Sequence, residues 1–224
     1  MPVMCIIRAS NVTPEKYDEV RRRVGWEADP PIGAISHAIA FDQNGATEVN
    51  LWENRELFDT YVETRLQTVL DQLGVVLDDV TLMDTHNAAI GAPAQDLMIP
   101  RGAEPRTIPE GPVMVVYPRA SISAELYERF RHSLPLDKVP PGSLAHIHGR
   151  AGDRVVTIDV WEDSAALAAF IRGALIPAIE AQGIEFVWPE IIKVDTLVTT
   201  PAAQAYVRPF TEEVRNSASE LAPA

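Results

Sequence analysis

Two histidines in matching sequence contexts are the residues of this chain best suited to chemistry. His37 and His146 each end a Gly-x-x-x-His motif, and a Pro-Pro pair stands shortly before the glycine in both places. An imidazole accepts or donates a proton near neutral pH, so each histidine could act as a pocket base or as a hydrogen-bond donor. We predict both as catalytic residues. The alternative is a structural histidine that was duplicated together with its surroundings.

Each histidine is followed by an alternating run that ends in Trp-Glu. The first run carries Asn50 and Trp52, and the second carries Asp159 and Trp161 at the corresponding places. Alternate residues of a strand point to the same face, so each polar residue shares a face with its tryptophan. We predict these four residues as substrate-binding groups.

The second run also offers a possible metal site. His146 and His148 are two residues apart on a strand, and Asp159 stands across the hairpin, as in a two-histidine, one-carboxylate site. The first run has Ile39 and Asn50 at the corresponding places, and an amide is a poor ligand for a transition metal. We therefore predict no metal and no other cofactor, and we keep the three-residue site as an alternative.

The elements that must position these residues are two hairpins, residues 33–53 and 142–162. In the first, Asn44-Gly45 favours a type I′ turn, because both central residues of that turn have positive φ. A two-residue loop there places His37 opposite Trp52, and opposed residues share a face. That face carries Ile35, His37, Ile39, Phe41, Glu48, Asn50 and Trp52, and the other carries Ala34, Ala38, Ala40, Val49 and Leu51.

The small residues of the second face would let a helix approach closely. A histidine and an amide on that face would lack hydrogen-bond partners. We therefore predict that His37 and Trp52 lie on the side of the sheet away from its helices, and that His146 and Trp161 do the same.

The second hairpin has a weaker turn signal, at Gly152-Asp153. A two-residue loop there pairs His146 with Asp159, and His148 with Thr157. A three-residue loop would break this match.

The rest of the chain repeats one order of elements twice. Apolar and helical periodicities predict strand, helix, hairpin, helix and strand in residues 1–87, and again in residues 112–200. This β-α-β-β-α-β order predicts the α+β class with two tandem ferredoxin-like domains. Residues 88–111 are predicted as a linker and residues 201–224 as a C-terminal tail.

Each predicted sheet has helices on one face and a partly apolar opposite face that needs cover. The other half of the chain offers that cover, so we predict that the two antiparallel sheets pack as an intrachain α/β barrel. The chain would then be a pseudo-dimer by itself, with a further homo-oligomer left open.

With its Gly-x-x-x-His motif, short hairpin, Trp-Glu strand end and Leu/Phe-rich helix before glycine, the sequence resembles the dimeric α/β-barrel superfamily. Within it, the chain looks most like antibiotic-biosynthesis-monooxygenase-like proteins, as a bacterial member with two fused copies. The resemblance implies that Trp52 and Trp161 match the strand tryptophan that lines the pocket of cofactor-free quinone-forming monooxygenases. Those enzymes have an asparagine where this chain has Glu48 and Thr157. This departure favours a non-catalytic protein.

Composition narrows the possible partners. The net charge of −13 argues against nucleic acid and against an anionic membrane, because both attract basic patches. The single cysteine, Cys5, excludes an intrachain disulfide and lies in an apolar stretch, as a buried thiol does. The first residues lack the basic region of a signal peptide, and no window is long enough to span a membrane. We expect a cytoplasmic protein.

Together these features predict a cytoplasmic protein of the monooxygenase-like α/β-barrel class that binds a small molecule of unknown identity. Its enzymatic form would be a cofactor-free oxygenase, isomerase or cyclase acting on an aromatic or polyketide-like compound. The first alternative is a non-catalytic ligand carrier, sensor or stress-associated interaction protein. A haem-binding protein is the third possibility.

Overall fold

The computed structural model describes residues 1–26, 28–91, 111–117, 122–123, 125–126, 129, 133–134, 139–151 and 154–208. Four predicted features lie wholly or largely outside the described residues: the linker, the first helix of the second copy, the Gly152-Asp153 turn and the end of the tail. Among the described helices, none is long and apolar enough to cross a membrane.

The first half of the chain builds an antiparallel four-stranded sheet in the order β4-β1-β3-β2. Its strands are β1 (Val3–Ala9), β2 (Ala34–Asp42), β3 (Gly45–Trp52) and β4 (Asp79–Gly91). Helix α1 (Pro14–Val24) joins β1 to β2. A continuous helical run joins β3 to β4, and it consists of α2 (Arg55–Tyr61), the π-helical η1 (Val62–Leu66) and α3 (Gln67–Leu73).

The second half has its main strands in the matching order β9-β5-β8-β7. They are β5 (Val113–Val116), β7 (Ser143–Ala151), β8 (Arg154–Trp161) and β9 (Glu190–Thr199), and the short β6 (Ile122–Ser123) pairs with β8. Its helical run consists of α5 (Ser164–Phe170), the π-helical η3 (Ile171–Leu175) and α6 (Ile176–Glu180). The two halves therefore carry a π-helical turn at the same place.

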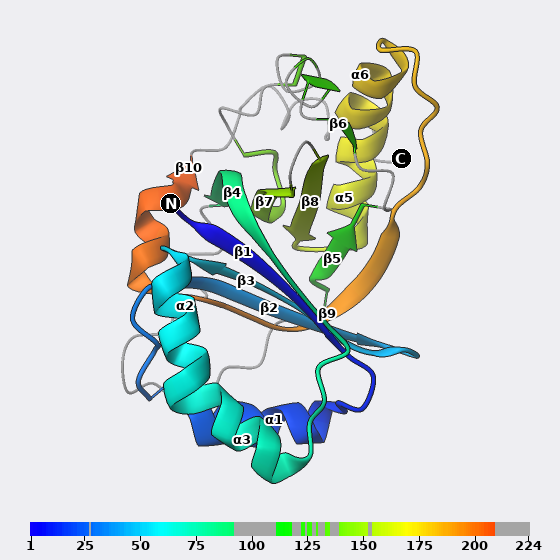
Figure 1. Ribbon diagram of the computed structural model, residues 1–224. Coiled ribbons are helices and arrows are strands. Elements are labelled where there is room, and N and C mark those ends of the chain that lie inside the picture. The colour runs from blue at the N-terminus through cyan, green and yellow to red at the C-terminus, as the bar shows by residue number, and fades with distance from the viewer. Residues whose placement is uncertain are drawn as a thin grey trace.

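Two further strand pairings join the sheets into a closed barrel. Strand β2 pairs with β9, and β4 pairs with β7, both antiparallel. Figure 1 shows α1, α2 and α3 outside the first sheet, with α5 and α6 at the other end of the molecule. The predicted fold, two ferredoxin-like units packed as one intrachain α/β barrel, is confirmed.

Local sequence explains where the helices begin and end. The side chain of Thr13 accepts a hydrogen bond from the Lys16 N–H, and Pro14 follows it as the first residue of α1. Asn54 and Asp163 cap α2 and α5 in the same way, at equivalent places in the two halves. Gly25 ends α1 with φ of 72°, a backbone conformation that favours glycine.

The barrel interior is filled with apolar side chains from both halves. It contains Met4, Ile6, Ile35, Ala38, Ala40, Val49, Leu51, Met83, Ala88, Ile90, Met114, Leu144, Ala145, Ile147, Ile158, Val160, Ile192, Val194, Leu197 and Ala203. A second kind of cluster lies between each sheet and its helices, and these clusters contain Trp52 and Trp161. Each sheet is therefore buried on both faces.

The predicted assignment of faces was wrong. Ala38, Ala40, Val49 and Leu51 point into the barrel, whereas Trp52 lies under the helices, and so does His37, which contacts Tyr17 of α1. The reason is that the interior of a closed barrel is narrow and dry, so it takes the small apolar face. The face with polar groups and large rings finds hydrogen-bond partners and room under the helices.

The register of the first hairpin also differs from the prediction. Asp42 pairs with Gly45, so the loop is Gln43-Asn44, and His37 stands opposite Asn50 instead of Trp52. Gly45 has φ of 112°, and a Cβ on it would lie 2.4 Å from the carbonyl oxygen of Ala9. The glycine is therefore needed for the approach to Ala9 rather than as the second turn residue. An irregularity between Ala34 and Ser36 exchanges the predicted faces of Ala34 and Ile35.

The register of the second hairpin agrees with the prediction. His146 pairs with Asp159, and His148 pairs with Thr157. Ala151 pairs with Arg154, as a two-residue connection requires.

The start of the tail closes against the first half. Segment η4 (Pro201–Tyr206) buries Ala203 in the barrel cluster, and β10 (Val207–Arg208) pairs in parallel with the end of β4. The Thr200 hydroxyl donates to the carbonyl of Ala34, which fixes this segment to β2.

Candidate functional site

In the first half, four polar side chains form a chain of hydrogen bonds between α1 and the sheet. Nε2 of His37 contacts the hydroxyl of Tyr17, and Nδ1 lies 2.7 Å from Oδ1 of Asn50. Nδ2 of Asn50 donates to Oε1 of Glu48 at 2.6 Å. An amide oxygen only accepts, so Nδ1 of His37 carries a proton, and in the neutral ring Nε2 accepts from Tyr17. Both ring nitrogens are therefore engaged.

Aromatic rings enclose this polar chain. Trp26 lies 5.2 Å from His37 and 6.3 Å from Trp52, measured between ring centroids. The Trp26 N–H donates to the hydroxyl of Tyr61 at 3.1 Å, and the Tyr61 ring is 5.1 Å from that of Trp52. His37 is 3% exposed. In this arrangement His37 offers no nitrogen to a ligand.

Charge inside the first cluster is concentrated on Glu48. Burial alone would raise the pKa of its carboxyl, but the neighbouring charge of His37 and hydrogen bonds from His37 and Asn50 hold that pKa below its usual value. Burial raises the pKa of the Tyr61 hydroxyl, and the charge of Glu48 raises it further. Burial also raises the pKa of the Cys5 thiol, as expected for an unreactive buried cysteine.

The second half presents its histidine differently. Nδ1 of His146 is hydrogen-bonded to Oδ1 of Asp159, a carboxylate that is almost fully buried. Nε2 of His146 is buried and has no hydrogen-bond partner among the described residues. A carboxylate on Nδ1 fixes the tautomer, so that Nε2 carries the lone pair and is free to accept a proton.

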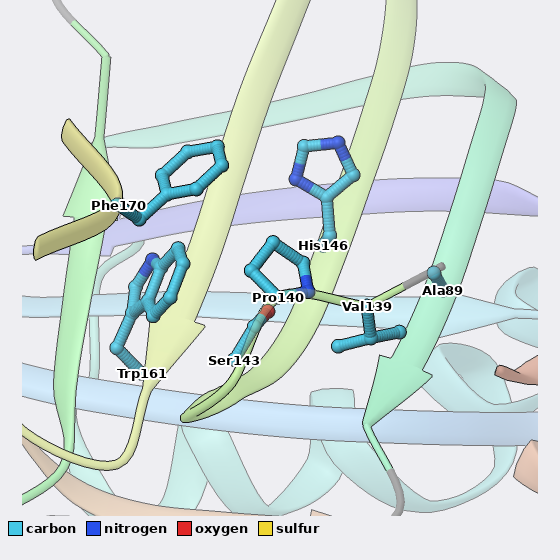
Figure 2. Close-up of a pocket in the computed structure, with 7 residues that line it drawn as sticks. All are labelled: Ala89, Val139, Pro140, Ser143, His146, Trp161 and Phe170. Carbon is cyan, nitrogen blue, oxygen red and sulfur yellow. The ribbon is translucent and has the colours of Figure 1, made fainter. Parts of the chain in front are cut away.

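A pocket lies beside His146 (Figure 2). Trp161 and the α5 residue Phe170 stand together at one side, with Pro140 between them and His146. The other lining residues are Ala89, Val139 and Ser143. Its cavity volume is about 10 Å³, and the empty space around it, open solvent included, is about 310 Å³. The cavity has room for roughly one water molecule.

Two further polar groups lie near His146. The indole N–H of Trp161, a residue that lines the pocket, is buried and has no hydrogen-bond partner among the described residues. Tyr117, the residue after β5, hydrogen-bonds to Asp159. Burial, the charge of Asp159 and this hydrogen bond raise the pKa of the Tyr117 hydroxyl well above its usual value. Asp159 thus receives a hydrogen bond from each side.

The metal alternative gains no support from this geometry. Nδ1 of His146 is bonded to Asp159, and Nδ1 of His148 lies 2.8 Å from the Thr157 hydroxyl. Within the described part of the chain, no three histidine, cysteine or acidic side chains are grouped to hold a metal ion.

The structure places the predicted site residues in two groups, one in each half of the chain. His37, Asn50 and Trp52 share one cluster, and His146, Asp159 and Trp161 share the other. Several important residues were not among the predicted site residues, namely Tyr17, Trp26, Glu48, Tyr61, Tyr117 and Phe170. Glu48 was within reach of sequence reasoning, because it precedes Asn50 by two positions on the same strand face.

Comparison with known proteins identifies the fold. No family model matches the chain, and no curated protein matches its sequence. A "putative monooxygenase" from Lactobacillus acidophilus NCFM superposes with a TM-score of 0.57 at 14% identity, covering 88% of this chain and 96% of its own. One from Fusobacterium nucleatum gives 0.57 at 14%, covering 88% and 94%. A "putative chlorite dismutase" gives 0.51 at 14%, covering 99% of both chains.

At these identities the likeness shows the fold alone. The neighbours share the ferredoxin-like, dimeric α/β-barrel fold, and this chain has the same fold within one polypeptide. The resemblance seen in the sequence is thus confirmed as to fold.

Proposed function

We propose that the protein binds a small hydroxylated aromatic compound in the pocket of its second half, with His146 as general base, in the manner of a cofactor-free enzyme of the monooxygenase-like class. One observation carries this proposal: His146 lines a pocket, its Nδ1 is held by the buried carboxylate of Asp159, and its buried Nε2 has no hydrogen-bond partner among the described residues. A histidine oriented by a carboxylate is the arrangement that general-base catalysis uses.

The chemistry at this site is proton removal. Nε2 of His146 takes the proton of a phenolic or enolic O–H, and the electron pair stays on the substrate oxygen as an oxyanion. Asp159 stabilises the imidazolium that forms. The electron-rich anion is the species that oxygenation, isomerisation or cyclisation needs.

The shape of the pocket limits the substrate. Trp161 and Phe170 offer ring faces against which a planar compound packs. A cavity of about 10 Å³ takes only the polar edge of such a compound, so its ring would lie outside the cavity. A porphyrin has no space in this cavity, so the pocket does not support the haem alternative.

A non-catalytic ligand carrier is the second candidate. It is favoured by the first half, where both nitrogens of the predicted catalytic residue His37 are engaged by the protein itself. A carrier would use the same pocket for binding without proton transfer.

The test combines binding and turnover. Tryptophan fluorescence reports binding of hydroxyaromatics such as 1-naphthol and 2,4-dihydroxyacetophenone, and oxygen uptake with product analysis reports turnover. We expect His146→Asn to lower turnover by about 10²–10⁴-fold, the usual contribution of a general base. Trp161→Phe should weaken binding. The matched control is His86→Asn, which removes an exposed imidazole.

Each outcome decides between the candidates. Binding that is lost in Trp161→Phe, with no turnover of any compound by the native protein, supports the carrier. Binding that is unchanged in both His146→Asn and Trp161→Phe rejects the pocket as the ligand site.

A further inference from the structure

Tyr117 touches the His146–Asp159 pair, but other residues line the pocket. We propose that Tyr117 is a positioning residue: its hydroxyl holds the carboxylate of Asp159, and the carboxylate in turn holds His146 in the orientation that a general base needs. This inference rests on the proposed function and adds a third member to the pair that removes the proton. Tyr117 acts through Asp159 and does not touch the substrate.

The register of the second sheet brings Tyr117 to Asp159. Val115 of β5 pairs directly with Asp159 of β8, and the N–H of Tyr117 donates to the carbonyl of Thr157 at 3.5 Å. Residues two apart on a strand share a face, so Tyr117 lies on the face that carries Val115 and Asp159. Tyr117 packs there against the apolar cluster that contains Val115 and Trp161. The carboxylate is one diagonal step away, within reach of a long aromatic side chain, and the Tyr117 hydroxyl is hydrogen-bonded to it.

A buried carboxylate needs more than one donor. Asp159 is 1% exposed, and an ionised carboxylate only accepts hydrogen bonds. His146 supplies one donor, its Nδ1–H, to Oδ1. The end of an aspartate side chain rotates over a broad range of angles, so one hydrogen bond leaves the plane of the carboxylate loosely defined. The second donor, from Tyr117, fixes that plane and therefore the orientation of the imidazole bonded to it.

The Tyr117 hydroxyl stays protonated, as a donor must. Burial, the charge of Asp159 and the hydrogen bond to Asp159 raise the pKa of this hydroxyl well above its usual value. Near neutral pH the hydroxyl therefore always has a proton to donate, and the carboxylate is held whether His146 is neutral or protonated.

The first half anchors the side chain beside its histidine with a group of the opposite kind. There Ile7 pairs with Glu48, and the Glu48 carboxylate accepts from Nδ2 of Asn50 at 2.6 Å. In the second half, Tyr117 and Thr157 occupy these two places. The amide of Asn50 has N–H groups to donate, so an acceptor anchors it, whereas a carboxylate needs a donor such as a tyrosine hydroxyl. Each half thus has the anchor that suits its own side chain.

The experiment follows the Nδ1–H proton of His146 by proton NMR of the full-length protein. An imidazole proton bonded to a carboxylate gives a low-field signal, which broadens when exchange with water becomes faster, and its loss in His146→Asn assigns it. We expect the signal to broaden beyond detection in Tyr117→Phe, because the carboxylate is no longer held. The matched control is Tyr206→Phe, which removes the hydroxyl of a half-buried tyrosine in η4 and should leave the signal sharp. A signal that stays sharp in Tyr117→Phe overturns the proposal.

An isosteric label covers the case in which Tyr117→Phe fails to fold. Fluorotyrosine at position 117 keeps the hydroxyl and makes it a stronger donor. The carboxylate then accepts less strongly from His146, so the signal should remain sharp and move to higher field. The same label at position 206 should leave the signal in place. A signal that does not move with the label at position 117 also overturns the proposal.

Kinetics separate this role from the proposed function. Tyr117→Phe should lower kcat about 10-fold with KM unchanged, at the lower end of what the loss of a histidine's outer partner costs. Added to Asp159→Ala, it should lower kcat no further, since the hydroxyl acts only through the carboxylate. An additive loss rejects the positioning role and leaves His146 as the base. A native protein without turnover, whose NMR signal is nevertheless lost in Tyr117→Phe, rejects the general base and supports the anchoring of Asp159 by Tyr117.

Discussion

Asn50 and Asp159 occupy the same position in their hairpins, each directly opposite a histidine: Asn50 faces His37, and Asp159 faces His146. In both pairs, the side-chain oxygen contacts Nδ1 of the histidine. The geometry is shared, but the charge is not. The oxygen beside His146 belongs to a carboxylate, whereas the oxygen beside His37 belongs to an amide, and the carboxylate of Glu48 stands 3.4 Å from Nδ1 of His37.

The first prediction concerns the carboxylate of Asp159. Asp159→Asn keeps the shape but removes the charge, so His146 should become a poorer base, and turnover should fall by about 10²-fold, at the lower end of a general base's contribution. Because the Asp159 charge raises the pKa of Tyr117, this variant should also lower that pKa, although burial keeps it above the usual value. Ultraviolet titration of tyrosinate measures the shift. An unchanged Tyr117 titration would contradict the contact between Tyr117 and Asp159.

The second prediction concerns stability in acid. The pKa of Glu48 is lower in the folded protein than its ordinary value of 4.5, so the folded state binds this proton less readily than the unfolded state does. Its contribution to stability is therefore complete above about pH 4.5 and is lost as the pH falls toward the folded pKa. Urea unfolding between pH 6 and pH 3 should show a shallower acid loss in Glu48→Gln than in the native protein.

A matched variant separates this effect from general charge removal. Glu63→Gln removes an exposed carboxylate from η1, and its acid dependence should match that of the native protein. Equal acid curves for the native protein and Glu48→Gln would show that Glu48 has the same pKa folded and unfolded.

Sequence reasoning succeeded where a pattern had only one structural solution. The repeated Gly-x-x-x-His and Trp-Glu motifs fixed the order of elements, and two apolar sheet faces in one chain required the barrel. It failed at the faces, because alternation says which residues share a face but not which face meets the helices. Ala38 and Ala40 suit a close helix as well as a narrow barrel, and only the closure by β9 decides between them.

The register error has a local cause. Asn44-Gly45 is a strong turn signal, yet Gly45 serves the close approach to Ala9, and that contact comes from β1, far away in the sequence. The sequence also did not show that Nε2 of His37 is engaged by the protein while Nε2 of His146 is not. Tyr17 comes from a helix, and nothing in the spacing of strand residues shows that its hydroxyl reaches Nε2 of His37.

The third prediction tests the glycine of the second Gly-x-x-x-His motif. Gly142 has φ of 77°, and a Cβ there would lie 2.5 Å from the Cβ of Ala166 in α5. Gly142→Ala should therefore lower the free energy of unfolding by about 1–3 kcal/mol, through backbone strain and overpacking. The control is Gly173→Ala in η3, where a Cβ would meet nothing within 4 Å. That change should be neutral or stabilising by up to about 1 kcal/mol, as chemical denaturation would measure.

The last prediction concerns the dependence of each half on the other. A chain that ends at residue 100 keeps β1 to β4 but loses β9, the partner of β2, and β7, the partner of β4. Both outer strands would then be open edges, which attract other strands. The barrel face of the sheet, with Met4, Ile35, Val49 and Leu51, would lose the apolar side chains of the second half that now cover it.

We therefore expect the truncated chain not to be a well-folded monomer. It should either form a homodimer, in which β2 of one copy pairs with β4 of the other, or lose its fixed aromatic packing. Analytical ultracentrifugation measures the first outcome, and near-ultraviolet circular dichroism measures the second. As a control, the full-length chain cut once between residues 92 and 110 should stay associated as a single compact particle, because all the pairings among β1 to β9 remain. A truncated chain that is monomeric and keeps a native-like near-ultraviolet spectrum would show that the first half does not need the second.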